Sequence, residues 1–344
     1  MFSTPCLHIY IDHHNTSRRE KQVGKTKENA GDCVTNRNNK KDRIYIKKDN
    51  EQLAGGKKMS YSKNNRNYRE KVCRREGRSH MVMVFIFFAV SILSSIAGSI
   101  CGIGGGVIIK PVLDAVGVMS VSSISFLSGC TVLAMSVVSV YKNIRAKSAK
   151  LNVRTATGLA VGAAAGGVMG KSMFQMLKSA VGNENLVGMT QAIVLIIITL
   201  GTLIYTMNKK KIHTKQYTQI WLCLVIGILL GIMSSFLGIG GGPINLVVLA
   251  YFFSMGTKEA ALSSLYIIMF SQITSLVQTC VTGTIPDIKI SYFLAMVIGG
   301  ILGGTLGSKV NKKIDEEGVN KLFIALMVVI VGINIYNAVK FALA

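Results

Sequence analysis

Acidic residues are scarce over most of this 344-residue chain. Residues 81–344 hold only seven, namely Asp114, Glu184, Glu259, Asp287, Asp315, Glu316 and Glu317. The same stretch has one histidine, His213, in a basic segment, and no two cysteines are spaced C-x-x-C. Metal sites, disulfide frameworks and most catalytic sets need such residues in clusters. The chain is therefore predicted not to be an enzyme and to bind no metal and no cofactor.

Long stretches carry no charge at all. They are residues 81–109, 115–141, 155–170, 185–208, 216–257, 260–286, 290–308 and 322–339. A bilayer core of roughly 30 Å takes about 20 apolar residues per helix, whereas a soluble protein needs a polar face on most helices. The sequence therefore predicts an all-α integral membrane protein with about eight transmembrane helices.

Basic residues account for the net charge of +23 and lie mostly outside these stretches. Residues 1–80 are polar and basic without an apolar run, and are expected to form a disordered cytoplasmic tail near anionic lipid. An alternative places the start downstream, at Met59 or Met81. Two further clusters are Lys142, Arg145, Lys147, Lys150 and Arg154, and Lys209, Lys210, Lys211 and Lys215. Short basic loops stay cytoplasmic, so the tail and both clusters are predicted on that side. No nucleic-acid partner is expected.

The membrane part repeats itself. Gly102-Ile103-Gly104-Gly105-Gly106 recurs as Gly238-Ile239-Gly240-Gly241-Gly242, an offset of 136 residues. Gly162, Gly166, Gly167 and Gly170 recur as Gly299, Gly303, Gly304 and Gly307, an offset of 137. This predicts two homologous four-helix repeats, 81–208 and 220–344, joined by a basic cytoplasmic linker, 209–219. Four crossings in each half would make the repeats parallel.

The GIGGG motifs are predicted to break helices. As one helix, residues 81–118 would reach about 57 Å, nearly twice the hydrocarbon thickness. Three consecutive glycines disfavour helix, and Pro111 and Pro243 suit the first turn of a new one. Broken helices at matching positions of two repeats point to a transporter site, and a restarted helix aims N–H groups at an anion. Predicted substrate-binding residues are Gly104, Gly105, Gly106, Gly240, Gly241 and Gly242. The alternative is close packing, which is the interpretation preferred for the later glycines.

Polar side chains near the breaks complete the candidate site. Lys110 and Asp114 are four residues apart, and Lys110 either attracts an anion or reaches water at the outer interface. Their repeat counterparts are Leu246 and Ala250. Ser128, its counterpart Ser264, and Asn245 are uncharged candidates for binding a dehydrated oxyanion. Helix–helix hydrogen bonding is the alternative for each.

Two apolar spans that each run into a GIGGG motif and a proline resemble the TauE/SafE family of sulfite exporters, over about residues 83–341. The resemblance implies a helical bundle of two homologous halves. It also implies transport of sulfite, a sulfonate or a related small anion across a bacterial cytoplasmic membrane. An anion channel is the alternative, followed by a membrane enzyme or assembly factor. Direction of transport, a proton or sodium coupling ion and homo-oligomer formation stay open.

Overall fold

The computed structural model describes residues 61–146, 152–217 and 219–343, and the regular structure in these residues is helical. The chain divides into two compact units, Met1–Glu76 and Gly77–Ala344. In the first unit, residues 61–76 form the start of helix α2 (Tyr61–Cys101). The predicted disorder of the tail lies outside the described residues up to position 60, whereas residues 61–80 are helical.

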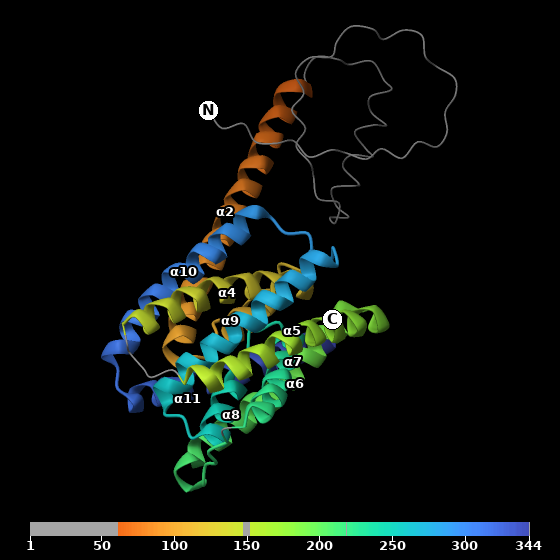
Figure 1. Ribbon diagram of the computed structural model, residues 1–344. Coiled ribbons are helices and arrows are strands. Elements are labelled where there is room, and N and C mark those ends of the chain that lie inside the picture. Colours follow the sequence, from red (N-terminus) through yellow and green to blue (C-terminus); the bar gives the residue numbers. More distant parts are fainter. Residues whose placement is uncertain (1–60, 147–151, 218, 344) are drawn as a thin grey trace. The chain divides into compact units, whose positions relative to one another are not determined.

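Ten α-helices are described, and the second unit is built from them (Figure 1). In the first half, α2 is followed by α3 (Gly106–Val116), α4 (Val121–Arg145), α5 (Val153–Val181) and α6 (Glu184–Asn208). After a 3-10 turn at Lys209–Lys211, the second half contains α7 (Ile220–Leu237), α8 (Pro243–Phe253), α9 (Thr257–Val281), α10 (Ile290–Lys313) and α11 (Glu316–Leu343).

Seven of these helices are long and apolar enough to cross a membrane: α2 from His80 onward, α4, α6, α7, α9, α10 and α11. Helix α5 has 29 residues, but Arg154, Lys171 and Lys178 interrupt its Gly- and Ala-rich sequence. The all-α integral membrane fold is thus confirmed. Each half has four long helices and a short one after its GIGGG motif, as the repeat predicted. Pro243 begins α8 as expected, but Pro111 lies inside α3, which already starts at Gly106.

The first GIGGG motif turns the chain back instead of merely interrupting a crossing. Helices α2 and α4 run the same way, because Ser99 and Ser139, each near a C-terminal end, share a hydrogen bond of 2.8 Å. Helix α3 returns between them. Leu113 near its end therefore shares a buried cluster with Phe87, which lies near the start of the α2 crossing. Gly98 allows the returning chain to lie directly on α2, since a Cβ there would collide with Gly105.

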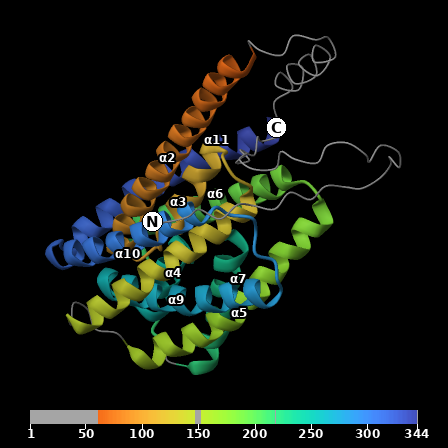
Figure 2. The ribbon, with the colours of Figure 1, turned by 90° about the horizontal axis from the view of Figure 1, so that it is seen from above.

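This reversal changes the relation between the halves. Helices α4 and α9 are repeat counterparts and lie side by side in opposite directions (Figures 1 and 2). Ser123 at the start of α4 donates a 3.4 Å hydrogen bond to the carbonyl of Asp287, just beyond the end of α9. At the other end, Asn143 of α4 and Lys258 of α9 line one cavity. The prediction of parallel repeats is therefore wrong. The halves are inverted, because each short helix adds a fifth pass to its half.

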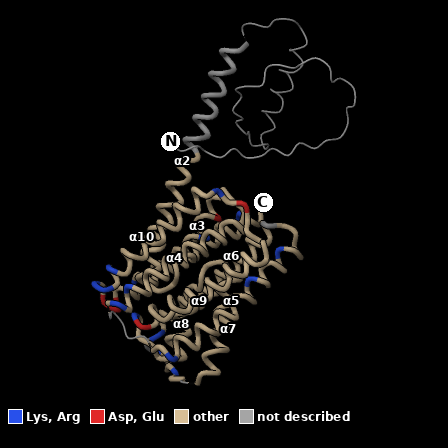
Figure 3. The backbone as a smooth tube through the Cα atoms, turned by 45° about the horizontal axis from the view of Figure 1, so that its top comes forward, with Lys and Arg blue, Asp and Glu red and all other residues tan. Residues whose placement is uncertain are grey.

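Charged residues lie mostly toward the ends of the helices (Figure 3). Helices α2, α4 and α6 end together: Ser99 and Asn143 line one cavity, and Cys101, Tyr205 and Lys209 line another. The basic clusters after α4 and α6 consequently share one end of the bundle, here called the cluster end. Residue 80, at the start of the α2 crossing, lies at the opposite end, here called the far end. Residue 80 and the basic clusters thus lie at opposite ends of the bundle, since three passes separate them and not two, whereas the predicted tail up to position 60 lies outside the described residues.

The glycines of α5 and α10 are packing residues, as predicted. A Cβ on Gly162, Gly166 or Gly170 would collide with the backbone of α7. A Cβ on Gly299, Gly303 or Gly307 would press on α2 in the same manner. Close approach of small residues is the usual way in which membrane helices associate. These two equivalent contacts hold each half against the first helix of the other.

Candidate functional site

The two GIGGG motifs meet in the interior of the bundle. The N–H of Gly242 donates a 3.2 Å hydrogen bond to the carbonyl of Ile103. A Cβ on Gly104 would lie 2.9 Å from the carbonyl oxygen of Gly240, and one on Gly106 would collide with that of Ile239. The sequence placed the motifs at equivalent positions, and the structure brings both to one place in the interior of the bundle.

Backbone conformation explains why several of these positions are glycine. Gly104 and its counterpart Gly240 have φ of 73° and 74°, and Gly241 and Gly242 have φ of 117° and 88°. Side chains other than glycine rarely adopt such values. Gly105 and Gly106 have ordinary φ values and are required for space instead, since Gly105 lies against the backbone of Ser94. The chain therefore reverses tightly at these glycines, and their positions leave no room for a side chain.

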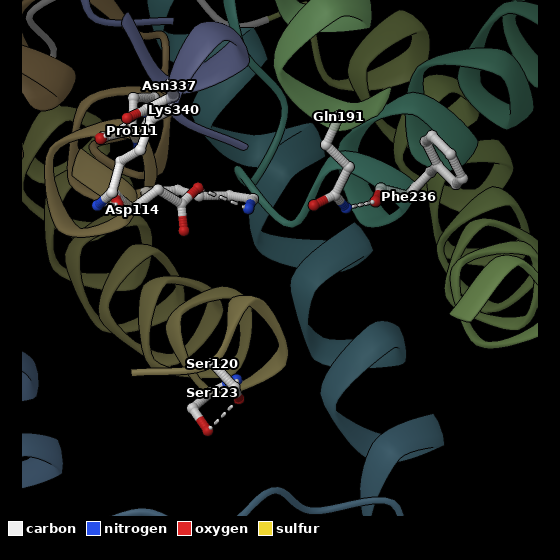
Figure 4. Close-up of polar contacts among 9 residues, drawn as sticks. Pro111, Asp114, Ser120, Ser123, Gln191, Phe236, Asn337 and Lys340 are labelled. Atoms are coloured by element: carbon white, nitrogen blue, oxygen red, sulfur yellow. Dashed lines mark hydrogen bonds and ion pairs between the residues drawn. The ribbon is translucent and has the colours of Figure 1, made fainter. Parts of the chain in front are cut away.

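An amide side chain holds the helix end before each break. Asn311 of α10 donates a 2.6 Å hydrogen bond to the carbonyl of Ile100 in α2. Gln191 of α6 donates one of the same length to the carbonyl of Phe236 in α7 (Figure 4). Ile100 and Phe236 are 136 residues apart and thus equivalent. A helix end leaves carbonyls without intrahelical partners, so these amides satisfy the same need in both halves.

The predicted neutral residues are buried with unused hydrogen-bonding capacity. Ser128 and Ser264 are each 0% exposed, and Asn245 is 1% exposed. Among the described residues, neither hydroxyl nor the Asn245 amide oxygen has a hydrogen-bond partner. The Ser128 hydroxyl would lie 2.9 Å from a Cβ on Gly106, and the Asn245 amide nitrogen 2.9 Å from one on Gly241. Buried polar groups are normally paired, so these groups can take a ligand at the breaks.

Lys110 lies elsewhere and is already paired. Its ammonium is 3.0 Å from the Asp114 carboxylate, and both residues are buried. Asn337 and Lys340 of α11 hold the same segment: Asn337 donates to the Pro111 carbonyl, and Lys340 to those of Asp114 and Ala115 (Figure 4). The suggested i,i+4 pair is thus formed. Because its charge is neutralised by Asp114, Lys110 is a support for α3 more than a free anion ligand.

Two small polar cavities lie beyond the breaks, and sequence reasoning missed both. Cavity A has Ser125, Lys171, Ser235, Gln272 and Ser275 among its lining residues, with Gly238 of the second motif. Cavity B has Ser99, Asn143, Lys258 and Asn311, with Ala261. Each measures about 10 Å³, roughly the room that one water molecule needs. Either cavity would therefore have to widen to hold an oxyanion.

The TauE/SafE sulfite exporter family matches residues 87–335. This chain belongs to that family. The match runs from α2 into α11 and includes both breaks and every cavity residue named above. Neither a search of curated proteins nor one of solved structures gave a match. As a member of a transporter family with several membrane-crossing helices, the chain is a multi-pass membrane protein.

The polar residues that line the two cavities differ in how visible they are in the sequence. Lys171 could have been found from the sequence, as a charge flanked on one side by the uncharged stretch 155–170. Gln272 is an uncharged polar residue within the uncharged stretch 260–286, and nothing in the sequence shows that α9 brings it to α5. Asn143 and Asn311 gave no signal, since each sits beside a basic helix end and resembles an ordinary surface amide.

Proposed function

We propose that this TauE/SafE protein is a secondary transporter that binds a small sulfur oxyanion, sulfite or a sulfonate, where the two GIGGG breaks meet. The observation that carries the proposal is the pair of inverted halves whose breaks touch at Ile103 and Gly242. Inverted repeats with broken helices at their interface are the architecture of alternating-access transporters. Irregular backbone inside a membrane is tolerated where it is buried in protein or lines a cavity.

Neutral donors suit this task. An oxyanion accepts hydrogen bonds, and serine hydroxyls and an amide NH₂ supply them. A site of neutral groups binds an anion less tightly than a site with a dedicated cation, so the anion can also leave. Ser128 and Asn245 provide this chemistry beside the glycines, and Ser264 is the buried repeat counterpart of Ser128. The family suggests sulfite or a related anion as the substrate, and the neutral hydrogen-bond donors of the site suit such an anion.

The orientation of the protein in the membrane follows from the positions of its basic segments. Short Lys- and Arg-rich segments stay in the cytoplasm. The cluster end carries Lys142 and Arg145 in the last turn of α4, Arg154 in the first turn of α5, and Lys209, Lys211 and Lys215 after α6. We therefore place the cluster end in the cytoplasm of a bacterial cell and the far end outside.

Uptake of radiolabelled sulfite, sulfate, thiosulfate and methanesulfonate into proteoliposomes tests the proposal. Saturable uptake of a sulfur oxyanion is expected, with loss in Gly241→Leu, whose side chain would collide with Ile268. Gly201→Leu is the matched control, because Gly201 has nothing within 4 Å of an added Cβ. No uptake by the folded wild-type protein would refute the proposal. A non-saturable anion current would identify a channel instead.

A further inference from the structure

Cavities A and B are counterparts under the internal repeat. Ser235 of cavity A corresponds to Ser99 of cavity B, and Ser125 corresponds to Ala261, both with the offset of 136. Each cavity also touches one break. Gly238 lines cavity A, and Ala261 of cavity B lies where a Cβ on Gly102 would collide with it. The inversion of the halves therefore places one cavity on each side of the breaks.

The order of residues along the two central helices shows the same arrangement. On α4, Ser125 belongs to cavity A, Val132 contacts Gly240, and Asn143 belongs to cavity B. On α9, the order runs oppositely, from Lys258 through Ile268 to Gln272. Lys258 and Gln272 are 14 positions apart, or about 21 Å along a helix. Cavity B is thus nearer the cluster end, cavity A is nearer the far end, and the site at the breaks lies between them.

Each cavity contains one lysine. Among the described residues, neither Lys171 nor Lys258 forms an ion pair, and Lys171 instead lies 5.4 Å from the ring centre of Phe174. The two lysines are not repeat counterparts, since Lys171 comes from α5 and Lys258 from the first turn of α9. Two nearly equivalent cavities have therefore each acquired a cation from a different helix.

Each cavity also contains a buried polar atom without a partner. In cavity A it is the hydroxyl of Ser125, and in cavity B it is the amide oxygen of Asn143. These residues are 7% and 5% exposed. A side-chain amide can turn to present its NH₂ group, and hydroxyls rotate freely. Lysine and neutral donors around a low-dielectric space favour an anion, because a positive charge acts more strongly there than in water.

We infer that cavities A and B are the outer and inner access sites of the anion pathway, and that Lys171 and Lys258 attract the anion from the two sides. The inference rests on the proposed transport function and adds residues to it. In transport, cavity A widens to admit the anion to the breaks while cavity B stays closed, and the inverted halves then exchange these states.

Sided transport kinetics test the inference. In proteoliposomes of one orientation, Lys171→Met is expected to raise KM about tenfold for anion supplied from the far end, since a contact worth about 1.4 kcal/mol is tenfold in affinity. Lys258→Met is expected to do so from the cluster end alone. Lys171→Arg and Lys258→Arg should keep most of the affinity. Lys321→Met is the control, because Lys321 pairs with Glu317 on the exposed surface.

A second measurement does not depend on flux. In a cysteine-free background, Ser275→Cys in cavity A and Ser99→Cys in cavity B are treated with a membrane-impermeant thiol reagent. Labelling of position 275 from the far end only, and of position 99 from the cluster end only, is expected, each slowed by sulfite. If the wild type transports but the methionine variants keep their KM from both sides, the inference fails and the proposed function stands. Labelling of either position from the wrong end overturns the inference even without flux data.

Discussion

The two short helices α3 and α8 follow equivalent GIGGG motifs but are held in different ways. Helix α3 contains the buried Lys110–Asp114 pair and is fastened to α11 by Asn337 and Lys340. Helix α8 has Leu246 and Ala250 at the corresponding positions and lines an apolar cavity. Its end is held by backbone hydrogen bonds from Lys215 and Tyr217 of the linker. The glycine motif therefore sets the reversal of the chain, and the side chains around it decide how firmly each half is anchored.

The largest expected effect on stability comes from removing one member of the buried Lys110–Asp114 pair in α3. Asp114→Ala leaves Lys110 buried without its partner, and removing one member of a buried ion pair costs about 3–5 kcal/mol. The double variant Lys110→Leu/Asp114→Ala gives α3 the residues of α8 and should recover most of the loss. The free energy of unfolding in mixed micelles measures both. Equal losses in the single and double variants would show that the pair has another role than mutual neutralisation.

A smaller effect on stability is expected at the GIGGG motifs, which both halves share. Gly106→Ala and Gly242→Ala should each cost about 1–3 kcal/mol and abolish transport, the first by overpacking and the second by backbone strain. In Gly106→Ala the new methyl group meets the backbone of Ile239, whereas Gly242 has φ of 88°. Gly201→Ala should change neither stability nor transport. If only one of the two motif variants lost transport, the breaks would not act as one site.

Sequence reasoning reached the helix breaks and the internal repeat, because glycine runs and repeat offsets are local signals. It failed on the direction of the chain after the break. A helix that resumes and a helix that turns back have the same composition, and only the contacts of Leu113 with Phe87 distinguish them. Cavities A and B were missed for a related reason, since they join residues from helices that the inversion brings together. The residues at the breaks could be predicted from the sequence, but the direction of the chain after each break could not.

The anchors of the two short helices should contribute less. Lys340 donates to the carbonyls of Asp114 and Ala115 at the end of α3, and Ser254 donates to that of Lys215 beside the end of α8. Loss of such bonds costs about 0.5–1.5 kcal/mol each. Lys340→Met should speed hydrogen exchange in α3 alone, and Ser254→Ala in the end of α8 alone. Faster exchange in both helices from either variant would mean that the two anchors are coupled.

The smallest change in stability is expected at Ser128, and it separates binding from packing. Ser99 shares hydrogen bonds of 2.8 Å with Ser139 and 3.3 Å with Ser308, so Ser99→Ala should cost about 1 kcal/mol. The Ser128 hydroxyl has no partner among the described residues, so Ser128→Ala should stay within about 0.5 kcal/mol of the wild type.

Transport should show the reverse order. If the Ser128 hydroxyl donates to the anion, Ser128→Ala lowers uptake of sulfite about threefold to tenfold, which corresponds to one hydrogen bond of about 0.7–1.4 kcal/mol. Ser264→Ala provides the matched measurement in the other half. Similar losses in both would place the anion midway between the inverted halves, whereas loss in one alone would place it on that half. Unchanged uptake in both variants would show that these hydroxyls do not bind the anion, and the Asn245 amide and the backbone N–H groups of the glycines would then be the remaining donors at the breaks.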